Sequence, residues 1–251
     1  MKKILTIAGF DPTGGAGLQA DLAVFTAFKL EGFSAVTAIT AQDGVRVTMV
    51  EPISPSILKK QLDTLLAAHK VDAVKIGMLG TGELANVVLL AIKRHSLQNV
   101  VLDTVLASSS GRRLLDKDGL SALKKLIPLA RIITPNIIEA GVLTGTKIKN
   151  IKNMEAAALE LHALGAENVL ITGGHLKAAP VDVLYDGKAF LHFEGKRIKA
   201  DKKTLHGTGC ILSSAISAQL AKGRTIKTAV KEAKAYLEKV IKKRMKTKTQ
   251  P

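Results

Sequence analysis

A short run towards the carboxyl-terminal end of the chain, His206-Gly207-Thr208-Gly209-Cys210, combines residue types that suit the handling of an anion. Its two glycines allow the backbone to approach a ligand closely, and an apolar, small-residue helical pattern begins at once. The unpaired N–H groups and the positive dipole end of a helix start suit a phosphate or a developing negative charge. The same position lowers the pKa of a thiol, so Cys210, the only cysteine, is expected to act as a base or nucleophile. The loop therefore indicates phosphoryl transfer, and a buried cysteine that opens an ordinary helix is the alternative.

Two acidic residues add a possible metal chemistry. Asp103 ends one apolar run, and Glu139 lies three residues after Asn136, which follows another such run. Magnesium prefers a few oxygen ligands or ordered waters beside phosphates, and two carboxylates on different strand ends would supply such ligands. Asn136 and Glu139 also have the spacing of a capping box, which requires no ligand. Both interpretations stay open from the local sequence.

The glycine-rich segment Gly14-Gly15-Ala16-Gly17 precedes another helical pattern. It does not match the dinucleotide-binding fingerprint, and no Gly-Lys-Ser/Thr follows it as in a Walker loop. We therefore interpret it as a turn that packs a helix against a bound substrate.

These residues need a scaffold, and alternating segments along the chain predict one. Runs rich in Val, Ile and Leu predict strands at residues 3–8, 34–40, 73–76, 100–102, 131–134 and 169–172. Helical spacing occupies residues 18–30, 55–68, 82–94, 119–127, 154–164, 210–221 and 226–243. Strands that alternate with helices predict an α/β fold, with a mostly parallel sheet covered on both faces. Antiparallel additions are expected at residues 45–50, 181–185 and 189–193.

In a sheet of this kind, ligands gather at the carboxyl ends of the strands. The segments that follow the expected strands carry glycine or short polar residues, as the rim of a ligand site requires. They span residues 8–17, 40–44, 77–80, 103–105, 134–136 and 173–175.

Composition limits the remaining possibilities. The 251 residues contain 47% apolar residues and one cysteine, and no linker interrupts them, so a single cytoplasmic domain over residues 1–251 is expected. No run of about 18 apolar residues predicts a membrane span. The net charge is +16, but residues 222–251 alone carry 11 lysines and arginines against two glutamates. We interpret this helix and the basic tail at about 242–251 as a solvated surface, with weak polyanion binding as the alternative and no specific nucleic-acid site.

Seven segments in order resemble the hydroxymethylpyrimidine/phosphomethylpyrimidine kinases, which belong to the ribokinase-like superfamily. The resemblance runs over nearly the whole chain. It rests on 8–21 (with Asp11-Pro12-Thr13-Gly14-Gly15-Ala16-Gly17), 37–42, 75–79, 101–105, Thr134-Pro135-Asn136, Gly173-Gly174-His175 and 206–210.

The resemblance implies a three-layer α/β/α ribokinase-like fold and an enzyme of thiamine biosynthesis. Such an enzyme uses ATP and Mg²⁺ to phosphorylate 4-amino-5-hydroxymethyl-2-methylpyrimidine and then its monophosphate. The implied substrate-binding residues are Gln42, which pairs with the aminopyrimidine edge, and Gly9, Asp11, Ala16, Met78 and Val105 around the ring. Cys210 would accept the hydroxyl proton beside an anion hole of Gly207, Thr208 and Gly209. Asn136, Thr172, Gly174 and Thr208 would contact the nucleotide, Asp103 and Glu139 would hold the metal, and the relatives imply a homodimer.

The chain departs from the family pattern where positive charge is usual. Thr172 stands where the family commonly has the lysine before Gly-Gly-His, and Ser109 stands where a phosphate-side loop often has another. Leu205 and Phe10 are also unusual for their positions, and Lys177 is a candidate to compensate for the missing charge. These changes place the second phosphorylation in question. They also keep open a pyridoxal or pyridoxine kinase on the same scaffold, and a catalytically weakened pyrimidine-binding regulator.

Overall fold

The computed structural model describes residues 1–108, 111–174, 176, 180–195, 197–198 and 200–247. Its described strands form one nine-stranded sheet in the order β3-β2-β1-β4-β5-β6-β7-β8-β9. The strands are β1 (Lys3–Phe10), β2 (Glu31–Gln42), β3 (Val47–Pro52), β4 (Ala73–Ile76), β5 (Val100–Leu102), β6 (Ile132–Ile133), β7 (Val169–Ile171), β8 (Val181–Tyr185) and β9 (Phe190–Glu194). Neighbours from β2 to β7 pair in parallel, whereas β3, β8 and β9 join antiparallel. The predicted mostly parallel sheet with antiparallel additions is confirmed.

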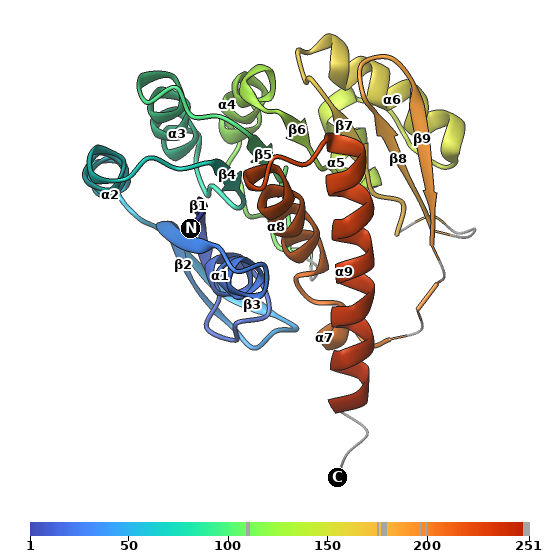
Figure 1. The fold of residues 1–251 in the computed structure, drawn as a ribbon, viewed down its shortest axis with the longest axis horizontal. Helices are drawn as coiled ribbons and strands as arrows, with labels where there is room; N and C mark the ends of the chain where they lie inside the picture. The colour runs from blue at the N-terminus through green and yellow to red at the C-terminus, as the bar shows by residue number, and fades with distance from the viewer. Residues whose placement is uncertain (109–110, 175, 177–179, 196, 199, 248–251) are drawn as a thin grey trace.

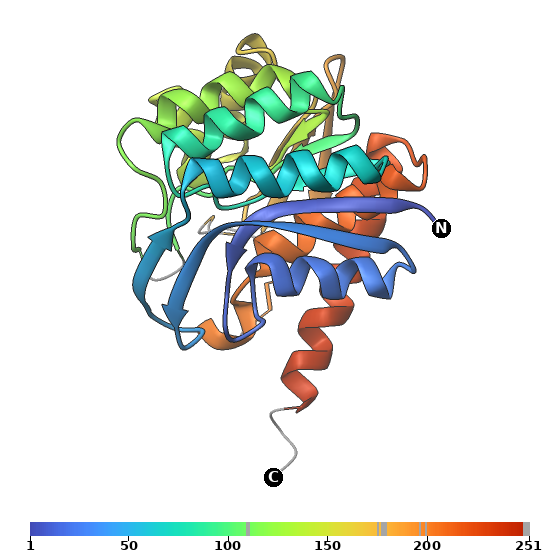
Figure 2. The same cartoon turned by 90° about the vertical axis from the view of Figure 1, so that its left-hand side faces the viewer.

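Helices cover both faces of this sheet and complete three layers (Figures 1 and 2). One layer contains α2 (Pro55–Ala68), α3 (Gly82–Arg94), α4 (Gly119–Leu126), α5 (Ile137–Thr144) and α6 (Ile151–Ala163). The other contains α1 (Gly17–Ala27), α8 (Thr208–Ala221) and α9 (Ile226–Thr247). The short helix α7 (Lys202–Leu205) precedes α8, and a 3₁₀ turn, η1 (Ile127–Leu129), follows α4.

The apolar runs of the parallel strands are explained by these two cores. Neighbouring residues of a strand point to opposite faces, so Leu102 packs in the core under α2–α6 and Val101 packs under α8 and α9. Ile4 and Leu5 of β1 divide in the same way. A strand buried on both faces has no polar alternation, which is why continuous apolar segments predicted the parallel strands.

The strand order reverses beside β1, because β2 lies on one side of β1 and β4 lies on the other. Ligand sites of open parallel sheets form at such a reversal, outside the carboxyl ends of the strands. The loops after β1, β4, β5 and β6 all leave this edge, and α8 packs against β1, β4 and β5. The fold therefore brings the separated motifs to one edge of the sheet. No helix in the described part of the chain is long and apolar enough to cross a bilayer.

Candidate active site

A cavity of about 540 Å³ lies at this edge of the sheet, in the size range of small-molecule sites. Its wall includes Gly9, Asp11, Ala16, Gln42, Met78, Asp103, Val105, Asn136, Glu139, Thr172, Gly207, Thr208, Gly209 and Cys210. Gly174 is exposed and is not part of the wall among the described residues. Ser109, Lys177 and His175 lie outside the described residues. A second hollow, of about 600 Å³ beside α2, is more open to solvent and contains none of the predicted site residues.

The amino terminus of α8 forms one side of the cavity. Gly207, its N-cap, has a left-handed φ of 73°, which favours glycine. A Cβ there would lie 1.9 Å from the Gly15 carbonyl oxygen, so the space also requires glycine. The first helical bond runs from the Ile211 N–H to the Gly207 carbonyl at 2.9 Å. The N–H groups of Thr208, Gly209 and Cys210 therefore come before the first bond of the helix and suit an anion.

The expectation of an acidic thiol is wrong for this environment. Cys210 is half-buried at the cavity wall. Desolvation of the thiolate raises the pKa of Cys210 to about 12, because the opposing charge of Lys75 does not outweigh burial and the nearby Asp103 and Asp21 carboxylates. The helix dipole that suggested a lowered pKa is one contribution among several, and desolvation is larger. Cys210 is therefore a neutral thiol near pH 7.

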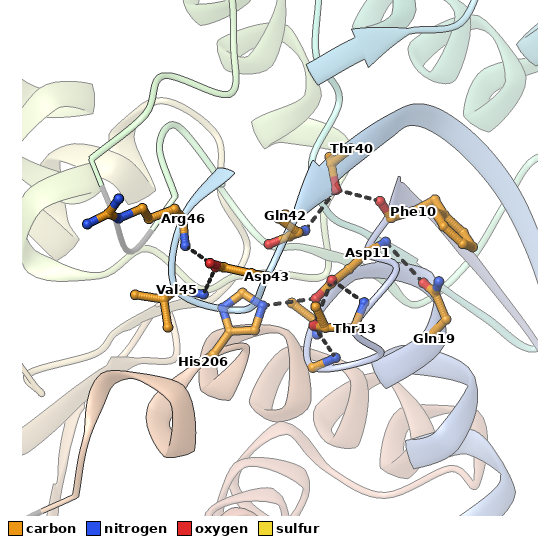
Figure 3. A network of polar contacts seen from close by, with 12 residues as sticks. Phe10, Asp11, Thr13, Gln19, Thr40, Gln42, Asp43, Val45, Arg46 and His206 are labelled. Atoms are coloured by element: carbon orange, nitrogen blue, oxygen red, sulfur yellow. Dashed lines mark hydrogen bonds and ion pairs between the residues drawn. The ribbon is translucent and has the colours of Figure 1, made fainter. Parts of the chain in front are cut away.

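The first glycine-rich loop is organised by the Asp11 carboxylate (Figure 3). Its Oδ1 accepts bonds from the Thr13 N–H at 2.9 Å and hydroxyl at 2.8 Å, and its Oδ2 accepts from the Ala16 N–H at 2.9 Å. Nε2 of His206 lies 2.9 Å from the same Oδ2. Burial alone would raise the pKa of Asp11, but its bonds to His206, Thr13 and Ala16 lower it overall. Asp11 therefore ties this loop to the loop before α8.

Gln42 is already oriented before any ligand binds. Its Nε2 donates to the Thr40 hydroxyl at 2.8 Å, and that hydroxyl donates to the Phe10 carbonyl at 2.9 Å (Figure 3). One N–H and the amide oxygen of Gln42 thus remain for a ligand with an adjacent donor and acceptor. Apolar surface from Ala16, Met78 and Val105 lies on the same cavity wall. This combination suits a flat heterocycle with a polar edge.

Two buried carboxylates, Asp103 and Glu139, also line the cavity. Desolvation and the charge of Asp103 together raise the pKa of Glu139 to about 8, and desolvation raises that of Asp103 as well. The Thr134 hydroxyl on the same wall is buried and has no hydrogen-bond partner among the described residues. A divalent cation would relieve the repulsion between the two carboxylates, and such a site offers hard oxygen ligands. The described residues hold no cluster of three metal-binding side chains, so waters or phosphates would have to complete the shell.

Glu139 also closes the capping box that the spacing allowed. Oδ1 of Asn136 accepts from the N–H groups of Ile138 at 2.8 Å and Glu139 at 3.0 Å, and Oε2 of Glu139 accepts from the Asn136 N–H at 3.0 Å. The two interpretations of this pair are thus compatible, because the cap fixes the carboxylate while its charge still faces Asp103.

Lys75 is a charged residue of the cavity wall that the sequence reasoning did not assign. It is fully buried, and its Nζ lies 2.9 Å from Oδ2 of Asp21, which also accepts from the Thr6 hydroxyl at 2.6 Å. Desolvation would lower the pKa of Lys75, but the charges of Asp21 and Asp103 and the hydrogen bond to Asp21 raise it overall. The signal in the sequence was one lysine inside an otherwise apolar strand.

The missing lysine at position 172 leaves few cations at the site. Thr172 lines the cavity, and its N–H donates to the Pro135 carbonyl at 2.9 Å. Among the described residues of the wall, Lys75 is the only lysine or arginine, and it already pairs with Asp21. An anion at this wall would therefore meet backbone N–H groups more than side-chain charge.

Comparison with known proteins shows which family this sequence and fold resemble. The sequence profile of the phosphomethylpyrimidine kinases matches residues 11–250. The hydroxymethylpyrimidine/phosphomethylpyrimidine kinase of Aquifex aeolicus is 41% identical over 240 residues, which cover 95% of this chain and 93% of that protein. The crystal structure of phosphomethylpyrimidine kinase from Clostridium difficile superposes with a TM-score of 0.86 at 40% identity, and covers 96% of this chain and 100% of the other. An ADP complex of Bacillus subtilis pyridoxal kinase gives 0.87 at 41% identity, over 94% and 90% of the two chains.

Proposed function

The chain belongs to the phosphomethylpyrimidine kinase family, and on this premise we propose that it uses ATP to phosphorylate 4-amino-5-hydroxymethyl-2-methylpyrimidine and then the resulting monophosphate. The enzyme is thus a phosphotransferase of thiamine biosynthesis. The observation that carries the choice of substrate is the oriented Gln42 amide in the same cavity as the amino terminus of α8.

The aminopyrimidine edge offers a donor, the 4-amino group, beside an acceptor, a ring nitrogen. The oxygen and the remaining N–H of the Gln42 amide would pair with these two groups, because Thr40 already occupies the other N–H. Ala16, Met78 and Val105 would contact the ring faces, and Gly9 would allow the ring to approach β1. The hydroxymethyl group would then extend towards α8.

In the transfer step, the hydroxymethyl oxygen forms a bond to the γ-phosphorus while the bond from that phosphorus to the bridging oxygen of ADP breaks. The N–H groups of Thr208, Gly209 and Cys210 would stabilise the charge on the phosphoryl oxygens without rearranging. A magnesium ion held near Asp103 and Glu139 would neutralise charge on the nucleotide phosphates. Asn136 and Thr172 would line the nucleotide side of the cavity.

The substrate proton needs an acceptor other than a Cys210 thiolate. A thiol whose pKa is about 12 is almost entirely protonated near pH 7. Phosphoryl transfer passes through a loose transition state in which the nucleophile needs little activation. We propose that the proton leaves late and passes to the transferred phosphoryl group, and that the neutral thiol positions the hydroxymethyl group.

Replacement of Cys210 should therefore have a limited effect that does not depend on thiol ionisation. We expect Cys210→Ser to retain most of kcat and Cys210→Ala to lower it by about tenfold, below the roughly 10²–10⁴-fold range of a general base. The ratio of wild-type to Cys210→Ser kcat should stay constant from about pH 6.5 to 9.5, because neither side chain ionises below pH 10 in this site. A ratio that rises about tenfold per pH unit would instead identify the thiolate as the working base.

Gln42→Leu should raise the KM for the pyrimidine by roughly 30-fold, because two hydrogen bonds of about 1 kcal/mol each are lost. The KM for ATP should change little. Thr40→Val should give a smaller increase, since Gln42 keeps its amide but loses the partner that orients it. Thr48→Val, on the neighbouring strand and outside the cavity wall, is the matched control. Equal KM values in the Gln42→Leu and control enzymes would remove Gln42 from substrate recognition.

The proposed function is tested by the product formed from ATP, Mg²⁺ and hydroxymethylpyrimidine. Formation of the diphosphate supports both steps, and accumulation of the monophosphate would restrict the enzyme to the first. The similarity to a pyridoxal kinase supplies a second candidate substrate. A higher kcat/KM for pyridoxal would overturn our substrate assignment. Single-turnover mixing that yields a bound pyrimidine and no ADP would instead indicate a binding protein.

We further propose a homodimer, supported by exposed apolar side chains on the sheet edge. Ile39 of β2 and Met49 of β3 are about half exposed, and the pairing register of the two strands puts them on the same face. A molecular mass measured by light scattering would test this. A single domain over residues 1–251, a cytoplasmic location and the absence of a specific nucleic-acid site remain proposals of the same kind.

A further inference from the structure

The basic end of α9 reaches the loops around the proposed anion hole. α9 continues past α8 towards the short helix α7 (Figure 1). Near its end, Nη1 of Arg244 donates to the carbonyls of His206 at 2.7 Å and Thr204 at 3.2 Å. Nη2 of the same guanidinium lies 3.3 Å from the carbonyl oxygen of Gly15. One side chain from the carboxyl-terminal helix thus contacts both the first glycine-rich loop and the loop before α8.

These two loops touch at the point where Gly207 opens α8. The space for a Cβ on Gly207 is filled by the Gly15 carbonyl oxygen, and a Cβ on Gly15 would lie 2.6 Å from the His206 ring. Arg244 therefore binds the Gly15 carbonyl, which lies against Gly207. It also binds the carbonyl of His206, the residue before Gly207. The Asp11–His206 contact joins the same two loops through their side chains.

Arg244 makes this connection through carbonyl oxygens, and no carboxylate of the described residues pairs with it. No ion pair of the described residues involves Arg244, although the side chain is half-buried. This partial removal from water lowers the pKa of the guanidinium. A charge that is desolvated without a counter-ion is unfavourable unless its donors are used. Its hydrogen bonds within the described part of the chain all go to backbone carbonyls, those of Gly15 in the first loop, Thr204 in α7 and His206 before α8. This is the arrangement expected of a side chain that fixes the position of these segments.

We propose that Arg244 is a positioning residue for phosphoryl transfer, which locks the Gly15 and Gly207 backbones together so that the amino terminus of α8 faces the transferred group. The inference rests on the proposed function. Arg244 is not part of the cavity wall, so its effect reaches the reaction through the loops. The planar guanidinium can contact carbonyls on two loops at once, whereas a lysine ammonium is a single point of contact.

The test compares Arg244→Met, Arg244→Ala and Arg244→Lys with Lys242→Met, which removes an exposed cation from the same helix end. We expect Arg244→Met to lower kcat by about 10- to 100-fold, the scale of a misplaced catalytic group, with the KM for the pyrimidine changed less than about threefold. Arg244→Lys should lie between the wild type and Arg244→Met. Guanidinium or methylguanidinium ions should restore part of the kcat of Arg244→Ala and leave Lys242→Met unchanged.

Several results would overturn the proposal. A wild-type kcat in Arg244→Met with a lower melting temperature would assign Arg244 to stability alone. A raised KM with unchanged kcat would indicate direct substrate binding. If Arg244→Met does not fold, Arg244→Lys decides, because wild-type kcat in that enzyme contradicts a bridge between two loops. These outcomes are distinct from failure of the proposed function, in which the wild-type enzyme itself forms no phosphorylated pyrimidine.

Discussion

Gly207→Ala is expected to lower kcat by about 10²–10³-fold, the cost of losing a donor from a preorganised anion hole. Two separate effects act at this residue. A left-handed φ of 73° costs a non-glycine residue roughly 1–2 kcal/mol. In addition, the new Cβ would lie 1.9 Å from the Gly15 carbonyl oxygen, so the two loops must separate. Separation moves the N–H groups of α8 away from the transferred phosphoryl group, and the measurement is steady-state kcat with ATP and the pyrimidine.

Gly223→Ala separates these two effects. Gly223 follows the opposite end of α8 and has a φ of 77°, but a Cβ there would meet no atom within 4 Å. Both variants therefore carry a similar backbone strain, and only Gly207→Ala displaces a neighbouring loop. We expect a comparable loss of melting temperature from the strain, with nearly normal kcat in Gly223→Ala. Equal losses of kcat in the two enzymes would contradict an anion hole at Gly207.

The fold was largely predictable because its strands are buried on both faces. The expected bounds of 73–76, 100–102, 55–68 and 82–94 agree with β4, β5, α2 and α3. The errors lie at element ends, where tertiary contacts decide. β1 continues to Phe10 because β2 pairs with it that far, and α9 continues to Thr247, beyond the expected end at 243. The four-residue helix α7 was missed because it is too short to show an apolar period.

The candidate site was predictable as far as the residues at or just after the strand ends and the start of α8. Loops after parallel strands share an edge of the sheet, so Gln42, Asp103 and Cys210 were expected in one place, and all three line the cavity. Two charged residues gave no such signal, Lys75 in the cavity wall and Arg244 outside it. Lys75 sits in an apolar strand, and Arg244 sits in a run of lysines that resembled a solvated surface. Their contacts join positions 54 and 229 residues apart, which no local pattern reveals.

The pKa of the thiol shows a second limit of local reasoning. A helix start predicts a lowered pKa at Cys210, and the charge of Lys75 and the Gly17 N–H also act in that direction. Desolvation acts in the opposite direction, and so do the carboxylates of Asp103 and Asp21, which come from two other segments of the chain. The pKa of a buried group depends on its burial and on every neighbouring charge, so its shift can be worked out only from the folded structure.

The second large effect concerns the acidic pair, Asp103 and Glu139. A substitution of Glu139 can remove its charge while it keeps the capping box of α5. Glutamine also satisfies a capping box, so Glu139→Gln should keep the bond to the Asn136 N–H and the start of α5. What it removes is the negative charge that the Glu139 carboxyl, whose pKa is about 8 without metal, would carry beside a bound cation. At about 4 Å from a cation and an effective dielectric constant near 20, a unit charge contributes about 4 kcal/mol, which corresponds to roughly 10³-fold. We therefore expect a loss of kcat/KM of about this size at low Mg²⁺, partly recovered at high Mg²⁺.

The raised pKa of Glu139 also predicts an effect on the melting temperature, which is measured without the reaction. Its value of about 8 lies above the ordinary 4.5, so the folded state binds this proton more tightly than the unfolded chain. The resulting stabilisation is complete below about pH 4.5 and is lost as the pH rises through 8. At pH 8.5 without metal, Glu139→Gln should therefore melt above the wild type, and added Mg²⁺ should raise the melting temperature of the wild type more than that of the variant. Glu83→Gln makes the same change in the first turn of α3, away from the cavity, and should alter neither quantity. If Mg²⁺ stabilises the wild type and Glu139→Gln equally, the cation binds elsewhere and the assignment of this carboxylate fails.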